Sequence, residues 1–171
     1  MTIIFGIDPG SRNTGYGIIS YQHNTPTCID YGTIKTNHSI MHERLGIIYH
    51  ELTTLLEQHC PTEVAIESIF FHKNAQSALK LGQARGAALA AVACHHHPLH
   101  EYAPREIKQA IVGRGAASKE QVQYMIKLLL KLPSTPQADA ADALAIALCH
   151  CHHLQLARTL KSSHITAGDG A

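Results

Sequence analysis

Residues 3–7 read IIFGI, an uninterrupted apolar run that ends on Asp8. A strand that is apolar on both faces belongs in the centre of a sheet that is covered on both sides. Pro9 holds Asp8 in an extended conformation, and the two-residue period of a strand places Asp8 on the same face as Ile4. The sequence therefore predicts a buried central strand over residues 2–8 with a carboxylate at its carboxyl end.

The size of the chain sets the number of domains. It has 171 residues, of which 45% are hydrophobic, and this favours one globular domain. We expect the domain to span residues 1–158 and the polar tail, 159–171, to be disordered. The N-terminus lacks a basic region and the alanine-rich segments are interrupted by polar residues, so we expect no signal peptide and no membrane association. The five cysteines form no disulfide framework, which favours free thiols and a cytoplasmic location.

Hydrophobic periodicity predicts an α/β fold. Short connections between the first three strands indicate an antiparallel meander, and a helix then returns the chain so that the fourth strand lies beside the first. The expected strands cover residues 2–8, 15–22, 27–36, 63–68 and 99–102. The expected helices cover residues 40–60, 74–95, 104–112, 118–132 and 137–155.

Three further acids lie where they could join Asp8. Glu67 ends the fourth strand as Asp8 ends the first, so adjacent strands would bring both carboxylates to one edge of the sheet. Asp139 and Asp142 are the only charged residues of an alanine-rich helix, and their three-residue spacing puts them on one face. Taken alone, Asp8 could cap a turn and Asp139 could complement the helix dipole, but the dipole explains Asp142 poorly.

A gathering of four carboxylates predicts bound metal. Without buried bases, the four acids would repel one another, and carboxylate oxygens are the ligands that Mg²⁺ and Mn²⁺ prefer. We expect two Mg²⁺ ions per chain, with Mn²⁺ as a substitute, in a site for phosphoryl transfer. The expected metal-binding and catalytic residues are Asp8, Glu67, Asp139 and Asp142.

Charge is distributed unevenly along the chain, although the net charge is only +1. Residues 73–131 hold nine Lys or Arg against three acids, whereas residues 1–72 hold three against seven. The basic segment could contact a polyanion, or it could form ordinary solvated helix faces. Within it, Ser118 is placed to cap a helix whose first turn carries Lys119, which offers a phosphate a docking position; an ordinary glycine-rich connection is the alternative.

Four segments together resemble the RuvC family of Holliday-junction resolvases, in the RNase H-like superfamily. They are GIDPGSRNTGYG at 6–17, AIESIF at 65–70, KNAQSALKLGQARG at 73–86 and PQADAADALAIA at 136–147. The resemblance spans residues 2–153 and implies an RNase H-like fold with a five-stranded mixed sheet flanked by helices. It implies a homodimer that binds a four-way DNA junction in recombination and repair and nicks two strands of like polarity symmetrically, leaving 5′-phosphate and 3′-hydroxyl ends. It also implies assembly with the branch-migration proteins RuvA and RuvB.

The resemblance also implies roles for single residues. The four acids match the family's metal ligands; some relatives have His at the third of these positions, where this chain has Asp139. Lys108 and Lys119 match lysines used for cleavage and DNA contact, and Phe70 matches an aromatic that stacks on a base, although Phe71 beside it could do the same. The remaining residues assigned to the DNA interface are Arg12, Lys73 and Arg85. The family uses the region of the helix at 74–95, which carries a stripe of small residues, for its dimer.

Other functions remain open at this point. The glycine-containing turn after Asp8 is also similar to the phosphate hairpin of actin-like and sugar-kinase ATPases, but those need two such domains. A YqgF-like nuclease of RNA metabolism and a junction-binding protein without catalysis are the nearest alternatives. The 14 histidines include clusters at 94–97 and 149–153, but consecutive helical residues point apart and no paired C-x₂-C is present, so we expect neutral surface histidines rather than a structural zinc site.

Overall fold

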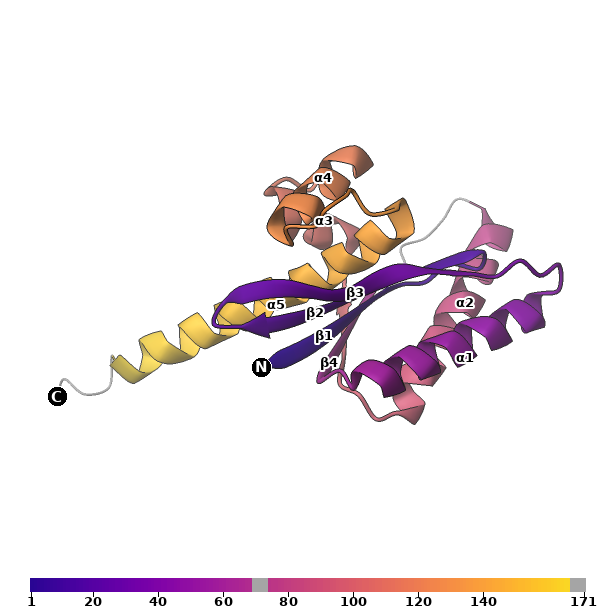
Figure 1. Ribbon diagram of the computed structural model, residues 1–171, viewed down its shortest axis with the longest axis horizontal. Coiled ribbons are helices and arrows are strands. Elements are labelled where there is room, and N and C mark those ends of the chain that lie inside the picture. Colours follow the sequence, from indigo (N-terminus) through magenta and orange to yellow (C-terminus); the bar gives the residue numbers. More distant parts are fainter. Residues whose placement is uncertain (69–73, 167–171) are drawn as a thin grey trace.

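The computed structural model describes residues 1–68 and 74–166, with side chains described as far as Leu160. A five-stranded sheet lies at the centre, in the order β3-β2-β1-β4-β5 (Figure 1). Its strands are β1 (Thr2–Asp8), β2 (Asn13–Gln22), β3 (Thr25–Lys35), β4 (Glu63–Glu67) and β5 (Leu99–Tyr102). The first three strands pair antiparallel, and β4 runs parallel to β1 and β5. The expected mixed sheet with an antiparallel meander is confirmed.

Among the described residues, five helices cover the two faces of this sheet. They are α1 (Met41–His59), α2 (Ala75–Cys94), α3 (Pro104–Val112), α4 (Lys119–Leu129) and α5 (Ala138–Thr166). Figure 1 shows α1 and α2 together on one side, with α5 along the other side and α3 and α4 beyond it. The side chains of β1 alternate accordingly: Ile4 belongs to the core under α5, and Phe5 and Ile7 to the core under α1 and α2. Asp8, which the two-residue period places on the face of Ile4, therefore faces α5.

Two helix ends differ from the expected ones. α4 stops at Leu129 because the chain turns immediately afterwards, with Lys131 in the left-handed region at φ 52°. α5 continues to Thr166, past 155 and past the boundary expected at 158. No glycine or proline lies between residues 137 and 167 to end it. Disorder of the tail stays a prediction, and residues 167–171 lie outside the described ones.

Within the described residues, no helix has the length and apolar character needed to cross a membrane. All five cysteines are free, as expected from their number and spacing.

Candidate active site

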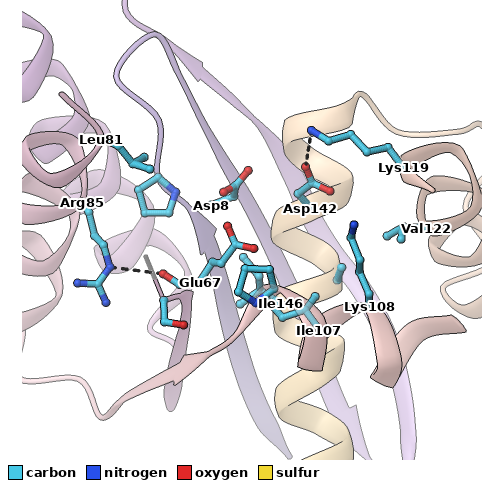
Figure 2. Close-up of a pocket in the computed structure, with 14 residues that line it drawn as sticks. Asp8, Glu67, Leu81, Arg85, Ile107, Lys108, Lys119, Val122, Asp142 and Ile146 are labelled. Atoms are coloured by element: carbon cyan, nitrogen blue, oxygen red, sulfur yellow. Dashed lines mark hydrogen bonds and ion pairs between the residues drawn. The ribbon is translucent and has the colours of Figure 1, made fainter. Parts of the chain in front are cut away.

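Two neighbouring parallel strands each end on an acid. Ile7 of β1 pairs with Ile66 of β4, so the next residues, Asp8 and Glu67, leave the sheet side by side at its carboxyl edge. Both side chains are partly buried. In Figure 2 the two carboxylates point into the same space. The local cause is the apolar middle of each strand, which is buried in the centre of the sheet, while a polar residue follows at the carboxyl end.

Close packing of α5 on the sheet adds the helix acids. A Cβ at Gly15 would stand 2.0 Å from the backbone oxygen of Asp139, and one at Gly6 would stand 2.1 Å from another carbonyl of α5. Only glycine allows the helix backbone to lie this near to β1 and β2. The approach carries Asp142 to the position opposite Asp8 that is visible in Figure 2.

The three carboxylates of Asp8, Glu67 and Asp142 line one cavity of about 420 Å³. Basic side chains from three helices border the same space, and apolar residues form its walls. The cations are Arg85, Lys108 and Lys119, and the apolar residues include Leu81, Ile107, Val122 and Ile146. Asp139 lies outside the cavity lining, but its charge acts on both Asp8 and Asp142. The four predicted acids are thus brought into one electrostatic unit, three of them around the cavity.

The electrostatics of this unit disfavour full ionisation. Burial raises the pKa of Asp8 to about 8, and the charges of Glu67, Asp142 and Asp139 add to this effect, with Lys119 opposing it. Burial also raises the pKa of Asp142, against the opposing charges of Lys119 and Lys108. A hard divalent cation would offset the repulsion between these crowded carboxylates, and oxygen atoms are its preferred ligands. The residues present therefore fit Mg²⁺.

A capped helix presents Lys119 to the site. The Ser118 hydroxyl accepts a hydrogen bond from the Gln121 backbone N–H, and the Gln121 side chain accepts one from the Ser118 N–H. This capping box, predicted from the sequence, begins α4. Lys119 Nζ lies 3.9 Å from Asp142 Oδ2 while 73% of its side chain is exposed, so the ammonium can meet an incoming anion.

The other residues predicted to contact DNA differ in how exposed they are and in whether they border the cavity. The Arg85 side chain is held within the protein: Nη2 lies 2.6 Å from Glu101 Oε2, and Nε donates to the Glu67 carbonyl oxygen at 3.4 Å. Arg12 is exposed in the turn after β1 and does not line the cavity. Phe70 and Lys73, with Phe71, lie outside the described residues.

Two features were not found by sequence reasoning. One is the ion pair between Arg85 and Glu101, which was not predicted. The other is the burial of a histidine, because all histidines were predicted to lie on the surface. That interpretation is wrong for His150, which is 2% exposed. His150 follows Ile146 by one helical turn on the buried stripe of α5, and this spacing was the available signal.

Comparisons with known proteins point to one family. The profile of the family described as crossover junction endodeoxyribonuclease RuvC matches residues 4–150. A relative of that name from Pseudoalteromonas translucida is 56% identical over 155 residues, which cover 91% of this chain and 89% of that protein. A second, from Cronobacter sakazakii, is 50% identical over 170 residues, covering 99% and 98%. The solved structure of Thermus thermophilus RuvC in complex with Holliday junction substrate superposes with a TM-score of 0.85 at 33% identity, covering 92% of this chain and 97% of that one.

Proposed function

The chain belongs to the RuvC family of crossover junction endodeoxyribonucleases, and we propose that its four acids hold two divalent metal ions for strand cleavage at a four-way DNA junction. The family makes the chain a Holliday junction resolvase. One observation supports the site: Asp8, Glu67 and Asp142 come from three separate elements to one cavity, with Lys108 and Lys119 at its border. The family also argues against the RNA-nuclease, ATPase and non-catalytic alternatives.

In the proposed mechanism, the metal ions and the protein side chains have different roles. When bound, the two ions would supply an activated water and stabilise the leaving oxygen. Asp8 and Glu67 hold their carboxylates at the carboxyl edge of the rigid sheet, and α5 holds Asp142 and Asp139 across from them. Lys119, mostly exposed beside Asp142, neutralises the phosphate as it enters, and Lys108 does so from α3. Cleavage would leave 5′-phosphate and 3′-hydroxyl ends.

We infer a homodimer built on α2, which would let two strands of like polarity be nicked symmetrically. The helix buries Ala84, Ala88, Ala91 and Val92 against α1 and the sheet. On its outer side Gly82 and Gly86 face open space and Leu79 is 63% exposed. An apolar, small-residue stripe of this kind allows close approach of a second copy.

The remaining proposals concern the DNA surface and partners. Arg12, Lys73 and Arg85 would contact phosphates, and Phe70 or Phe71 would stack on a base near the junction centre. Action on DNA with free thiols is consistent with the cytoplasm. Assembly with RuvA and RuvB rests on the family resemblance.

The decisive experiment separates binding from cleavage. Asp8→Asn and Asp142→Asn would be compared with the unaltered protein on a synthetic four-way junction and on a linear duplex, with Mg²⁺ and with chelator. We expect paired nicks on the junction alone, dependent on Mg²⁺, and a loss of at least about 1,000-fold in rate for each variant while binding persists. Lys127→Gln, at the other end of α4 from Lys119, is the matched control that keeps full activity. Cleavage that survives Asp8→Asn would contradict the proposed metal site.

A separate measurement addresses the dimer. Gly86→Glu places a charge in the outer stripe of α2 where a Cβ meets nothing within 4 Å. We expect a monomer by sedimentation and a loss of paired nicking, whereas Gly46→Glu, on the exposed side of α1, remains dimeric. A dimeric Gly86→Glu variant would move the interface elsewhere.

A further inference from the structure

A second group of metal-binding side chains lies away from the four acids. Glu63 begins β4, His100 lies in β5 and His150 lies in α5. Because Ala65 pairs with His100, and Glu63 is two residues before Ala65, both side chains face α5 and meet His150 there. Glu67 ends β4 four residues beyond Glu63, which puts this group about 13 Å along the strand from the acids.

The three side chains are spaced for coordination. One ligand atom from each lies within 4.8 Å of the other two. Glu63 Oε2 lies 2.9 Å from His100 Nε2 and 4.0 Å from His150 Nε2. Zinc bonds of about 2.0–2.2 Å place neighbouring tetrahedral ligand atoms roughly 3.3–3.6 Å apart. Shifts of a few tenths of an ångström to about one ångström would bring all three onto one ion.

The surroundings of His150 are a second observation, separate from the spacing, that points to a metal ligand. Its ring is 2% exposed, and Nε2 has no hydrogen-bond partner in the part of the chain that the structure describes. The other ring nitrogen, Nδ1, lies 2.6 Å from the Tyr102 hydroxyl. In the tautomer with the proton on Nδ1, that nitrogen donates to the Tyr102 hydroxyl, and Nε2 keeps a free lone pair 4.0 Å from Glu63 Oε2. A metal ligand oriented through its second nitrogen has this arrangement.

The solvent exposure of this group and the charge state of His150 are both compatible with a bound metal ion. The side chains of His100 and Glu63 are 41% and 26% exposed, so the group opens to solvent on the side away from His150. Burial and the neighbouring His100 and His153 hold the pKa of His150 at about 4, which keeps this imidazole neutral near pH 7. Neutral imidazole is the form that binds metals.

We propose that Glu63, His100 and His150 form a second metal site, selective for Zn²⁺ over Mg²⁺, with water in the remaining position. Two imidazoles and one carboxylate suit zinc, whereas magnesium prefers oxygen ligands alone. The ion would tie β4, which carries Glu67, and β5 to α5, which carries Asp142. Its role is therefore to fix the strand and helix that hold opposite sides of the cavity. This proposal does not depend on the metal chemistry proposed for the four acids.

The test measures metal binding directly. Protein stripped with chelator is titrated with Zn²⁺ in a calorimeter, and with Co²⁺ in a spectrophotometer. We expect one tight ion per chain, an intense tetrahedral visible spectrum with Co²⁺, and no sulfur-to-metal charge-transfer band. The last observation separates this site from the exposed thiols of Cys60 and Cys94.

Variants assign the site. His100→Gln, at a partly exposed position, and His150→Gln should each weaken Zn²⁺ binding at least tenfold and abolish the Co²⁺ spectrum. His153→Gln, one turn further along α5, and Asp142→Asn should keep both. Zn²⁺ should raise the melting temperature of the unaltered protein but not that of folded His100→Gln, and millimolar Mg²⁺ should not replace it. Absence of a tight Zn²⁺ site, or unchanged binding in His100→Gln, would overturn the proposal.

Discussion

Gly15 lies against the backbone of Asp139: a Cβ at position 15 would stand 2.0 Å from the Asp139 carbonyl oxygen. Gly15 is also the residue opposite Asp8 in the β1–β2 register. One glycine therefore sets the separation between an acid of the sheet and the helix that carries two more. Any side chain here forces α5 away from β2, because a backbone carbonyl cannot rotate out of the way as a flexible side chain can.

Gly15→Ala should therefore damage packing and activity together. We expect the free energy of unfolding to fall by about 1–3 kcal/mol, measured in urea. The rate of junction cleavage should fall at least about tenfold, because misplacing catalytic groups by about 1 Å is costly. Gly46→Ala, on the exposed side of α1 with nothing within 4 Å, is the control and should add about 0.5–1 kcal/mol of stability. Unchanged stability in Gly15→Ala would show that α5 can move freely.

Local pattern was sufficient to predict the sheet and the acids. β1 is apolar on both faces and ends on Asp8, and this pattern predicted both the central place of the strand and the side of the sheet, shared with Ile4, on which Asp8 lies. Pro61 and the helical spacing before it predicted the crossover that sets Glu67 beside Asp8. The spacing of Asp139 and Asp142 predicted their shared side of α5. These features depend on periods of two and 3.6 residues, which a single sequence displays directly.

Contacts between distant elements were beyond that reasoning. The partner of Arg85 is Glu101, on β5, and nothing near Arg85 in the sequence indicates it. Likewise, Glu63, His100 and His150 meet only because β4, β5 and α5 stack. Two further histidines lie close to His150 in the sequence, at 152 and 153, but the residues that meet it, Glu63 and His100, lie on other elements. Such contacts can be predicted only once the register of the strands and the position of the helix on the sheet are known.

Lys119→Gln should lower the cleavage rate more than the affinity. The ammonium is the nearest described cation to Asp142, at 3.9 Å. Its removal takes away one positive charge from the position proposed for phosphate. We expect cleavage to fall about 10- to 100-fold and the dependence of log affinity on log salt to lose roughly one unit of slope. Stability should change by less than about 0.5 kcal/mol because the side chain is 73% exposed. A Lys119→Gln variant with a normal rate would remove Lys119 from the site.

The cysteines should divide into two reactivity classes. Burial raises the pKa of Cys149 and of Cys151 to about 12, and burial with the charge of Asp30 raises that of Cys28 to about 11. Since the thiolate is the reactive form, at pH 8 these thiols are almost wholly protonated and inert. Cys60 and Cys94 are exposed. Titration with a disulfide reagent should find two fast thiols in the native protein and five in denaturant. A rapid reaction of Cys149, identified by mass spectrometry, would contradict the packing of α5.

Glu101→Gln should strengthen DNA binding by releasing Arg85. The carboxylate of Glu101 lies 2.6 Å from the guanidinium, which also donates to the Glu67 carbonyl oxygen and borders the cavity. Without its counter-charge, the guanidinium can neutralise a phosphate, so junction affinity at low salt should rise about two- to fivefold and the salt dependence should steepen by roughly one unit. The comparison that decides the cause is a double-mutant cycle: in the Arg85→Gln background, Glu101→Gln should produce little of this gain. An equal gain in that background would mean that Glu101 repels DNA by itself, and Arg85 would then serve to hold the end of β4 rather than to contact the junction.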